Sequence, residues 1–261
     1  MSFNNIILEN KDGIGFITLN DPENRNTVSG PIVGELGQCL DECNDDPNVR
    51  AIVIRGAGSV FSAGGNIKAM KERLEKGIDY RANMRNLGTI IVKIRNIRKP
   101  VIASIHGAAA GAGLSLALVC DFRIMVEDTK CVFAFVNLGL IPDCGAPLPL
   151  VKMVGAARAT ELLMTGRMFT GKEAYDWGLV NQIVPHDQLE AATMKFAKKL
   201  AQGPTVAYGM IKAMINRNAF GGLELELDNE VEFQSLCART EDHIGAVDAF
   251  IEKRKPVFQG R

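Results

Sequence analysis

The stretch "KPVIASIHGAAAGAGLSLALVCD", residues 99–121, decides the fold of this 261-residue chain. From Val101 to Cys120 it contains no formally charged residue, over a length that would cross a bilayer. It is, however, rich in glycine, alanine and serine and contains His106, so it is not apolar enough for a typical membrane span. We therefore predict a buried strand, a glycine-rich turn and a buried helix, which together are a building unit of layered α/β cores.

The segments on the N-terminal side, and those that follow directly, repeat this alternation of strands and helices. Residues 5–20 predict a hairpin around Lys11, Asp12 and Gly13. Residues 29–46 predict a helix with Pro31 in its first turn. Further strands are predicted at 49–57, at 121–128 and from residue 131 onward. Because short β-β-α units recur, the predicted fold class is α/β.

The C-terminal part of the chain predicts mainly helices. Helical patterns cover residues 157–166, 170–178, 188–203 and 204–220, with a short strand at 179–185. One or two amphipathic helices are predicted in 224–258. No low-complexity linker interrupts the sequence, so we predict a core of residues 1–200 and a helical subdomain of residues 201–261 rather than two independent domains.

Composition excludes some classes of function. Thirty basic side chains balance thirty acidic ones, so no overall charge favours nucleic acid or an anionic membrane, and neither is an expected partner. The six cysteines form no CxxC pair and no zinc spacing with the three histidines, so no metal site is expected. The first residues lack the pattern of a signal peptide. Reduced thiols in apolar segments fit a cytoplasmic protein.

Two glycine-rich turns offer backbone N–H groups to a ligand. They lie in "FSAGGNIKAM", residues 61–70, and in residues 106–118. The second contains G-x-G before a helix, but the dinucleotide pattern fails at Leu116. Small residues let a ligand approach the backbone, and a helix start adds positive potential. If the two turns face each other, an oxygen held between their N–H groups would occupy an oxyanion hole; the other interpretation is tight packing alone.

A single carboxylate stands out in "NLGLIPDCGAPLP", residues 137–149. Asp143 has the apolar neighbours Ile141, Pro142 and Cys144. Such a side chain lies either at a turn in water or in a pocket, where burial would raise its pKa and favour a role as a base. The residues alone leave both interpretations open.

Five motifs, taken together, resemble the crotonase (enoyl-CoA hydratase/isomerase) superfamily. They are "FSAGGNIKAM" at 61–70, "KPVIASIHGAAAGAGLSLALVCD" at 99–121, "LGLIPDCGA" at 138–146, "RATELLMTGRMFTGKEAYDWGLVNQIV" at 158–184 and "AFIEKRKPVF" at 249–258. The resemblance implies a spiral of repeated β-β-α units with a C-terminal helical region that serves trimerisation and active-site closure. It also implies acyl-CoA thioester substrates, no separate cofactor beyond the coenzyme A of the substrate, and a homo-oligomer, either a trimer or a dimer of trimers.

Position by position, the resemblance assigns roles within the site. The oxyanion N–H groups would come from Gly65 and Ala112. Two glutamates used by enoyl-CoA hydratases correspond here to Ser115 and Phe135, neither of which exchanges protons as a carboxylate does. Asp143 occupies the acidic position of enoyl-CoA isomerases. The segment around it most resembles the branch that isomerises 1,2-epoxyphenylacetyl-CoA, which implies fatty acid metabolism or aromatic degradation.

The same resemblance predicts which residues contact the substrate. Arg25, Ala63 and Lys68 would lie along the nucleotide and pantetheine, Ser115 and Phe135 beside the acyl group, and Phe250 and Lys253 would close the site. The preferred function is an isomerase that converts 3-enoyl-CoA to 2-enoyl-CoA or acts on a ring epoxide. The alternatives are a hydratase or decarboxylase-like homologue that uses the oxyanion hole alone, and a non-catalytic RNA-binding relative.

Overall fold

A computed structural model describes residues 3–261; residues 1 and 2 of the predicted core range lie outside it. Its main sheet has six strands in the order β1-β2-β3-β4-β6-β9. The first two strands pair antiparallel and the others pair parallel. A second, three-stranded sheet has the order β5-β7-β8. The bounds are β1 Ile6–Lys11, β2 Ile14–Leu19, β3 Ala51–Gly56, β4 Val101–Ile105, β5 Ala108–Ala110, β6 Phe122–Val126, β7 Lys130–Val132, β8 Phe169–Thr170 and β9 Gln182–Val184.

The predicted hairpin is confirmed, with its turn at Asp12 and Gly13. Both residues have positive φ, 55° and 77°, which is the backbone geometry that two-residue hairpin turns require. The predicted strands at 49–57, 121–128 and 179–185 are also confirmed, as β3, β6 and β9. The strand predicted from residue 131 is only the short β7, because the chain then enters a 3-10 turn at Val136–Leu138.

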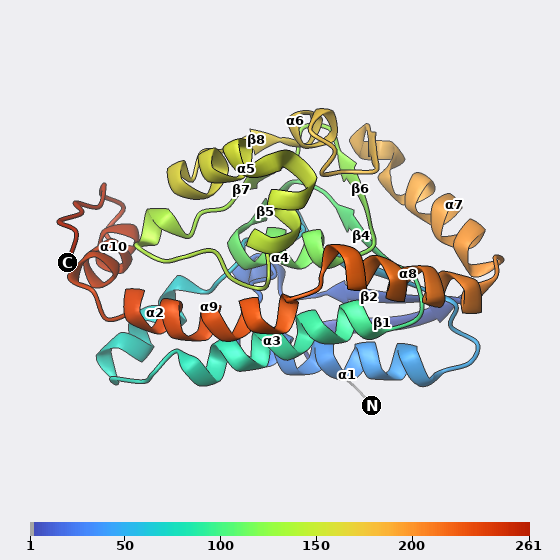
Figure 1. Ribbon diagram of the computed structural model, residues 1–261, viewed down its shortest axis with the longest axis horizontal. Helices are drawn as coiled ribbons and strands as arrows, with labels where there is room; N and C mark the ends of the chain where they lie inside the picture. Colours follow the sequence, from blue (N-terminus) through green and yellow to red (C-terminus); the bar gives the residue numbers. More distant parts are fainter. Residues whose placement is uncertain (1–2) are drawn as a thin grey trace.

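Ten helices occur in the part of the chain that the structure describes, and most surround the main sheet (Figure 1). α1, α3 and α9 lie side by side along one flank, and α7 covers the other face. The bounds are α1 Pro31–Asp45, α2 Ile67–Glu75, α3 Arg81–Asn96, α4 Gly111–Val119, α5 Pro147–Thr165, α6 Gly171–Asp176, α7 Leu189–Ala201, α8 Thr205–Ala219, α9 Leu223–Cys237 and α10 Glu241–Ile251.

Several helices differ from the sequence predictions. α2 and α3 were not predicted, although together they occupy most of residues 67–96. α5 begins ten residues before the predicted start at 157, and its backbone departs from helical geometry at Gly155, whose φ is 76°. The segment predicted as one or two helices at 224–258 contains two, α9 and α10.

Both faces of the main sheet are buried, and β2 illustrates the alternation. Ile14 and Phe16 belong to the apolar cluster under α7, whereas Ile17 and Leu19 belong to the larger cluster that includes α1, α3 and α4. A parallel sheet covered on both faces has apolar residues at consecutive positions, because each side chain meets a packed layer on one side or the other. The strand sequences therefore read as continuous apolar runs.

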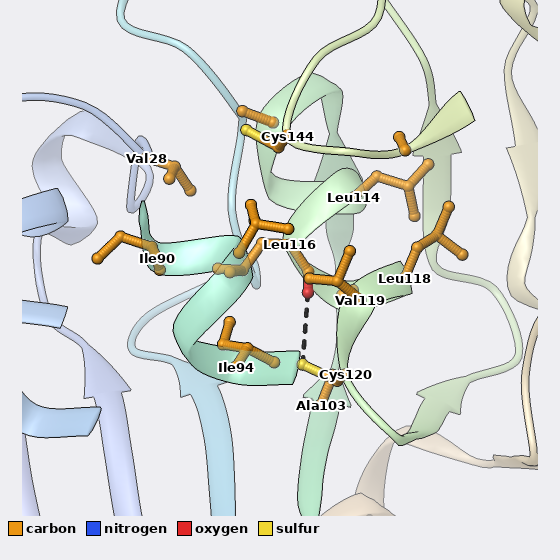
Figure 2. Packing of buried hydrophobic residues seen from close by; sticks show 14 of the residues in the cluster. Val28, Ile90, Ile94, Ala103, Leu114, Leu116, Leu118, Val119, Cys120 and Cys144 are labelled. Atoms are coloured by element: carbon orange, nitrogen blue, oxygen red, sulfur yellow. Dashed lines mark hydrogen bonds between the residues drawn. The ribbon is translucent and has the colours of Figure 1, made fainter. Parts of the chain in front are cut away.

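α4 lies at the centre of the larger cluster, and every one of its nine residues is buried. Figure 2 shows Leu114 and Leu118 on one side of this helix and Leu116 on the opposite side, among residues from neighbouring elements. The burial of β4 and α4 explains why residues 101–120 carry no charge. Within residues 3–261, no helix is both long and apolar enough to cross a membrane.

Candidate active site

A cavity of about 490 Å³ connects the motif residues. Its size is in the range of small-molecule sites, and most of the side chains that line it are apolar. The glycine-rich turns, α2, α3, the segment before Asp143, α9 and α10 all contribute to its wall. A more open groove of about 590 Å³ lies between α1 and α3, but none of the predicted site residues lines it.

The turn that contains Gly65 is fixed by hydrogen bonds between the Ser62 side chain and the backbone. Ser62 donates a hydrogen bond from Oγ to the carbonyl of Asn26 (2.7 Å) and accepts one from the Gly64 amide (3.2 Å). Gly64 has a φ of 88°, and a Cβ there would lie 2.5 Å from the Ala110 carbonyl oxygen. This glycine therefore allows the turn to pack directly against the chain that leads into α4.

Ala112 is the second residue of α4, so its amide belongs to the first helical turn. N–H groups in that turn have no carbonyl partner within the helix, and the helix dipole adds positive potential there. Gly65 and Ala112 both line the cavity. The two turns thus meet at the cavity, as the oxyanion-hole interpretation requires, although the tight packing at Gly64 shows that the alternative, a packing role, also applies.

Asp143 lies in the cavity and not at a turn in water. Asp143 is only 7% exposed, and its Oδ2 accepts a hydrogen bond from Nε2 of Gln234 (3.2 Å). Oδ1 is buried without a hydrogen-bond partner among the described residues. Burial raises the pKa of this carboxyl to about 6. The result is a buried carboxyl group at the wall of an apolar cavity, with one oxygen that has no hydrogen-bond partner among the described residues.

α9 holds the loop that carries Asp143. The Gln234 side chain accepts a hydrogen bond from the Ile141 amide (3.0 Å) and donates one to the Ile141 carbonyl (3.1 Å). One turn earlier on α9, the Glu230 carboxyl accepts from the Gly145 amide (2.9 and 3.1 Å). Both ends of the loop are therefore anchored to the same helix.

Glu230 and Gln234 were not predicted as site residues. The signal lay in the pattern of α9, where the buried positions include Leu227 and Val231 together with these two polar residues. Polar side chains on the buried face of an amphipathic helix need a partner inside the protein. That partner is the Asp143 loop.

The structure places only some of the predicted substrate residues at the cavity. Arg25, Ala63, Phe135 and Phe250 line it. Ser115 does not: it is fully buried and donates a hydrogen bond to the Gly111 carbonyl (3.2 Å), so its place beside the acyl group stays a prediction. A serine in a helix interior satisfies its hydroxyl in this way with the carbonyl four residues earlier.

The two lysines predicted to bind the substrate lie outside the cavity wall. Lys68 and Lys253 are both exposed, and Lys253 has a positive φ of 57° at the end of α10. Their contact with the nucleotide portion of a substrate stays a prediction. No group of three or more potential metal ligands gathers anywhere in residues 3–261.

Comparison with known proteins identifies the family. Residues 9–261 match the sequence model described as enoyl-CoA hydratase/isomerase. The chain belongs to the enoyl-CoA hydratase/isomerase family. A crystal structure of an enoyl-CoA hydratase from Mycobacterium avium subsp. paratuberculosis superposes with a TM-score of 0.90 at 29% identity, covering 99% of this chain and 100% of that one. The predicted crotonase fold is thereby confirmed.

Relatives within the enoyl-CoA hydratase/isomerase family are named either as isomerases or as hydratases. The chain is 34% identical to the 1,2-epoxyphenylacetyl-CoA isomerase of Escherichia coli over 257 residues, covering 95% of this chain and 96% of that protein. It is 37% identical to a probable enoyl-CoA hydratase of Bacillus subtilis, covering 95% of each. Membership of the family is therefore firm, while the names of its relatives divide between isomerase and hydratase.

Proposed function

We propose that the protein is an acyl-CoA double-bond isomerase, with Asp143 as its base. The observation that carries the proposal is the buried Asp143 carboxyl group, whose Oδ1 has no partner among the described residues, at an apolar cavity that Gly65 and Ala112 also line. The positions that correspond to the two hydratase glutamates hold Ser115 and Phe135. This site has a base and an oxyanion hole but lacks the pair of carboxylates that hydration uses.

The proposed reaction moves one proton between two carbons of the same chain. The thioester oxygen accepts hydrogen bonds from Gly65 and Ala112, and the Asp143 carboxylate takes a proton from C2 of a 3-enoyl-CoA. The electron pair of the C2–H bond forms a dienolate, whose negative charge rests on the thioester oxygen. Asp143 then returns the proton to C4, and the double bond moves to C2–C3. Atoms and charge balance without water.

The raised pKa of Asp143 supports this role. A carboxylate in water is too weak a base for a carbon acid, and burial that raises the pKa to about 6 brings it closer to the working pH. Each oxyanion donor contributes on the order of 3 kcal/mol to such reactions. Since the base must be ionised, turnover is expected to fall as the pH decreases through about 6.

Ring-epoxide isomerisation is the second candidate reaction. It is favoured by the 34% identity to the Escherichia coli 1,2-epoxyphenylacetyl-CoA isomerase. A panel of 3-enoyl-CoA, ring-epoxide CoA and crotonyl-CoA substrates distinguishes these reactions. Hydration of crotonyl-CoA at a rate equal to or above that of isomerisation would contradict the proposal and favour the hydratase alternative.

The direct test is Asp143→Asn. We expect isomerase turnover to fall at least about 100-fold, because the amide cannot accept the C2 proton. Asp45→Asn, on the exposed side of α1, is the matched control and should leave turnover unchanged. Circular dichroism and binding of a saturated acyl-CoA would verify that both variants are folded. Full turnover in Asp143→Asn would place the base elsewhere.

A further inference from the structure

The cavity region contains a second buried carboxyl group, which the proposed reaction does not use. Glu230 is 3% exposed, and its only hydrogen bonds among the described residues come from the backbone of the Asp143 loop. It does not line the cavity, whereas Asp143 does. Two carboxyl groups thus meet at one loop, one at the cavity and the other behind it.

The surroundings of Glu230 disfavour its ionisation. The titratable groups that face it are the Asp143 carboxyl, the Cys144 thiol and the Glu226 carboxyl one turn earlier on α9. The cations of the adjacent α3, Arg81 and Arg85, do not offset this effect: they lower the pKa of Glu232, which lies on the exposed side of α9. Burial and the proximity of Asp143 raise the pKa of Glu230 to about 9, although the Gly145 amide opposes this.

We propose that Glu230 is a positioning residue. Its side chain, in the neutral carboxylic acid form, holds the Asp143 loop in place. This inference rests on the proposed function, in which Asp143 is the base. The two carboxyls then hold one proton between them at neutral pH, and the proton resides on Glu230. Asp143 is the ionised member because it borders the cavity, where water or substrate stabilises its charge.

A neutral Glu230 limits the site to a single negative charge throughout the reaction. When Asp143 accepts a proton, its negative charge is replaced by that of the thioester oxygen. A second, fixed negative charge behind the loop would oppose the enolate and would also hold a proton on Asp143. The Glu230 carboxyl therefore supplies a hydrogen-bond acceptor for Gly145 without adding a charge.

The experiment compares Glu230→Ala and Glu230→Gln in the full-length protein, with Asp228→Asn on the exposed side of α9 as the matched control. Glu230→Ala leaves the buried Gly145 amide without its partner, so we expect kcat to fall about tenfold or more with a smaller change in KM. Glu230→Gln keeps an acceptor and mimics the neutral acid, so it should recover most of that loss. Asp228→Asn should behave as the wild type.

The pH profile separates positioning from a purely structural role. In the wild type, kcat/KM should fall both below about pH 6 and above about pH 9, where Glu230 ionises. In Glu230→Gln the acid limb should stay in place and the alkaline limb should disappear. An acid limb that moves down by one pH unit or more would mean that Glu230 is ionised in the working enzyme, which overturns the proposal. Wild-type kcat in Glu230→Ala would also overturn it.

An infrared measurement tests the neutral state without any turnover. At pH 7.5 the wild type should show the carbonyl band of a buried protonated carboxyl, and Glu230→Gln should lack it. Absence of this band from the wild type overturns the inference about Glu230. Presence of the band in a protein with no isomerase activity would refute the proposed function while the neutral Glu230 stands.

Discussion

At the scale of single residues, the burial that suits Asp143 to its proposed role as a base also lowers the stability of the fold. Burial raises its pKa from 3.8 to about 6 in the folded chain. Between these two values the folded protein binds more protons than the unfolded one, so stability decreases as the pH rises through this window. At neutral pH the ionised, buried carboxylate destabilises the fold by about 2–3 kcal/mol.

Removal of this charge should therefore stabilise the protein. We predict that Asp143→Asn raises the Tm at pH 8 by on the order of 5 °C, given a typical relation between free energy and Tm for a chain of this size. At pH 4, where the wild-type carboxyl is protonated, the two proteins should unfold at nearly the same temperature. Differential scanning calorimetry across pH 4–8 measures this, and a Tm difference that does not depend on pH would contradict the explanation.

Some of the residues at the cavity could be predicted from the sequence and others could not. Asp143, Gly65 and Phe135 could be predicted because short motifs specify their backbone setting, and all three line the cavity. Glu230 could not, because its partner Gly145 lies 85 residues away and only the fold brings them together. Ser115 is buried away from the cavity wall, which its position in a motif does not reveal, because the motif alone does not show which side of α4 faces the cavity.

At the scale of elements, the packing of α4 against the Gly65 turn is the critical contact. Gly113, in the first turn of α4, has no space for a side chain: a Cβ there would lie 2.5 Å from Cβ and Oγ of Ser62. Ser62 in turn fixes the Gly64 amide. A side chain at Gly113 would thus displace Ser62 and, through it, the turn that carries Gly65, one of the two proposed oxyanion donors.

We predict that Gly113→Ala lowers kcat about ten- to hundredfold, because small displacements of catalytic groups are costly. Stability should fall by about 1–3 kcal/mol through overpacking. Gly34→Ala in α1 is the control, since a Cβ there has no atom within 4 Å and alanine favours the helix. Steady-state kinetics and urea unfolding provide the two measurements. An unchanged kcat in a destabilised Gly113→Ala would show that the turn absorbs the pressure.

Helices and strands were predictable where burial gives their sequence a regular apolar pattern. Strands covered on both faces are continuous apolar runs, and the sequence predicts them. α2 contains no buried residue and carries many charges, so no apolar stripe marks it. α3 does have buried residues at helical spacing, including Leu87, Ile91 and Ile94. That spacing was a usable signal for a helix, although no side-chain cap marks where α3 begins.

At the scale of the whole molecule, the C-terminal helices expose an unusual number of large apolar side chains. On α8 these include Val206 and Met214, which are 79% and 67% exposed. On α9 they include Leu225 and Leu236, at 67% and 63%. Apolar surface of this extent on neighbouring helices is typical of an interface between subunits.

We therefore predict that the protein assembles as a trimer or a dimer of trimers through these helices. Sedimentation velocity at micromolar concentration should show no major species at the 28.3 kDa of a single chain. Met214→Lys should weaken the assembly, because burying an unpaired ammonium group at an interface is costly. Lys195→Met, which removes a charge on α7, provides a comparison on another helix. A stable wild-type monomer would contradict the prediction.

The strand order of the main sheet also determines how the chain reaches its native state. Among the strands within residues 3–261, only β1 and β2 are joined by a tight turn. β6 pairs with β9 through Ile124 and Gln182, which are separated by the whole of α5 and α6. Parallel pairings of this kind close long loops, so they form late and slowly. Until then the apolar strands β4 and β6 are open to other chains, and aggregation competes with folding. The same apolar strands that stabilise the native sheet are thus the segments most prone to aggregate before folding is complete.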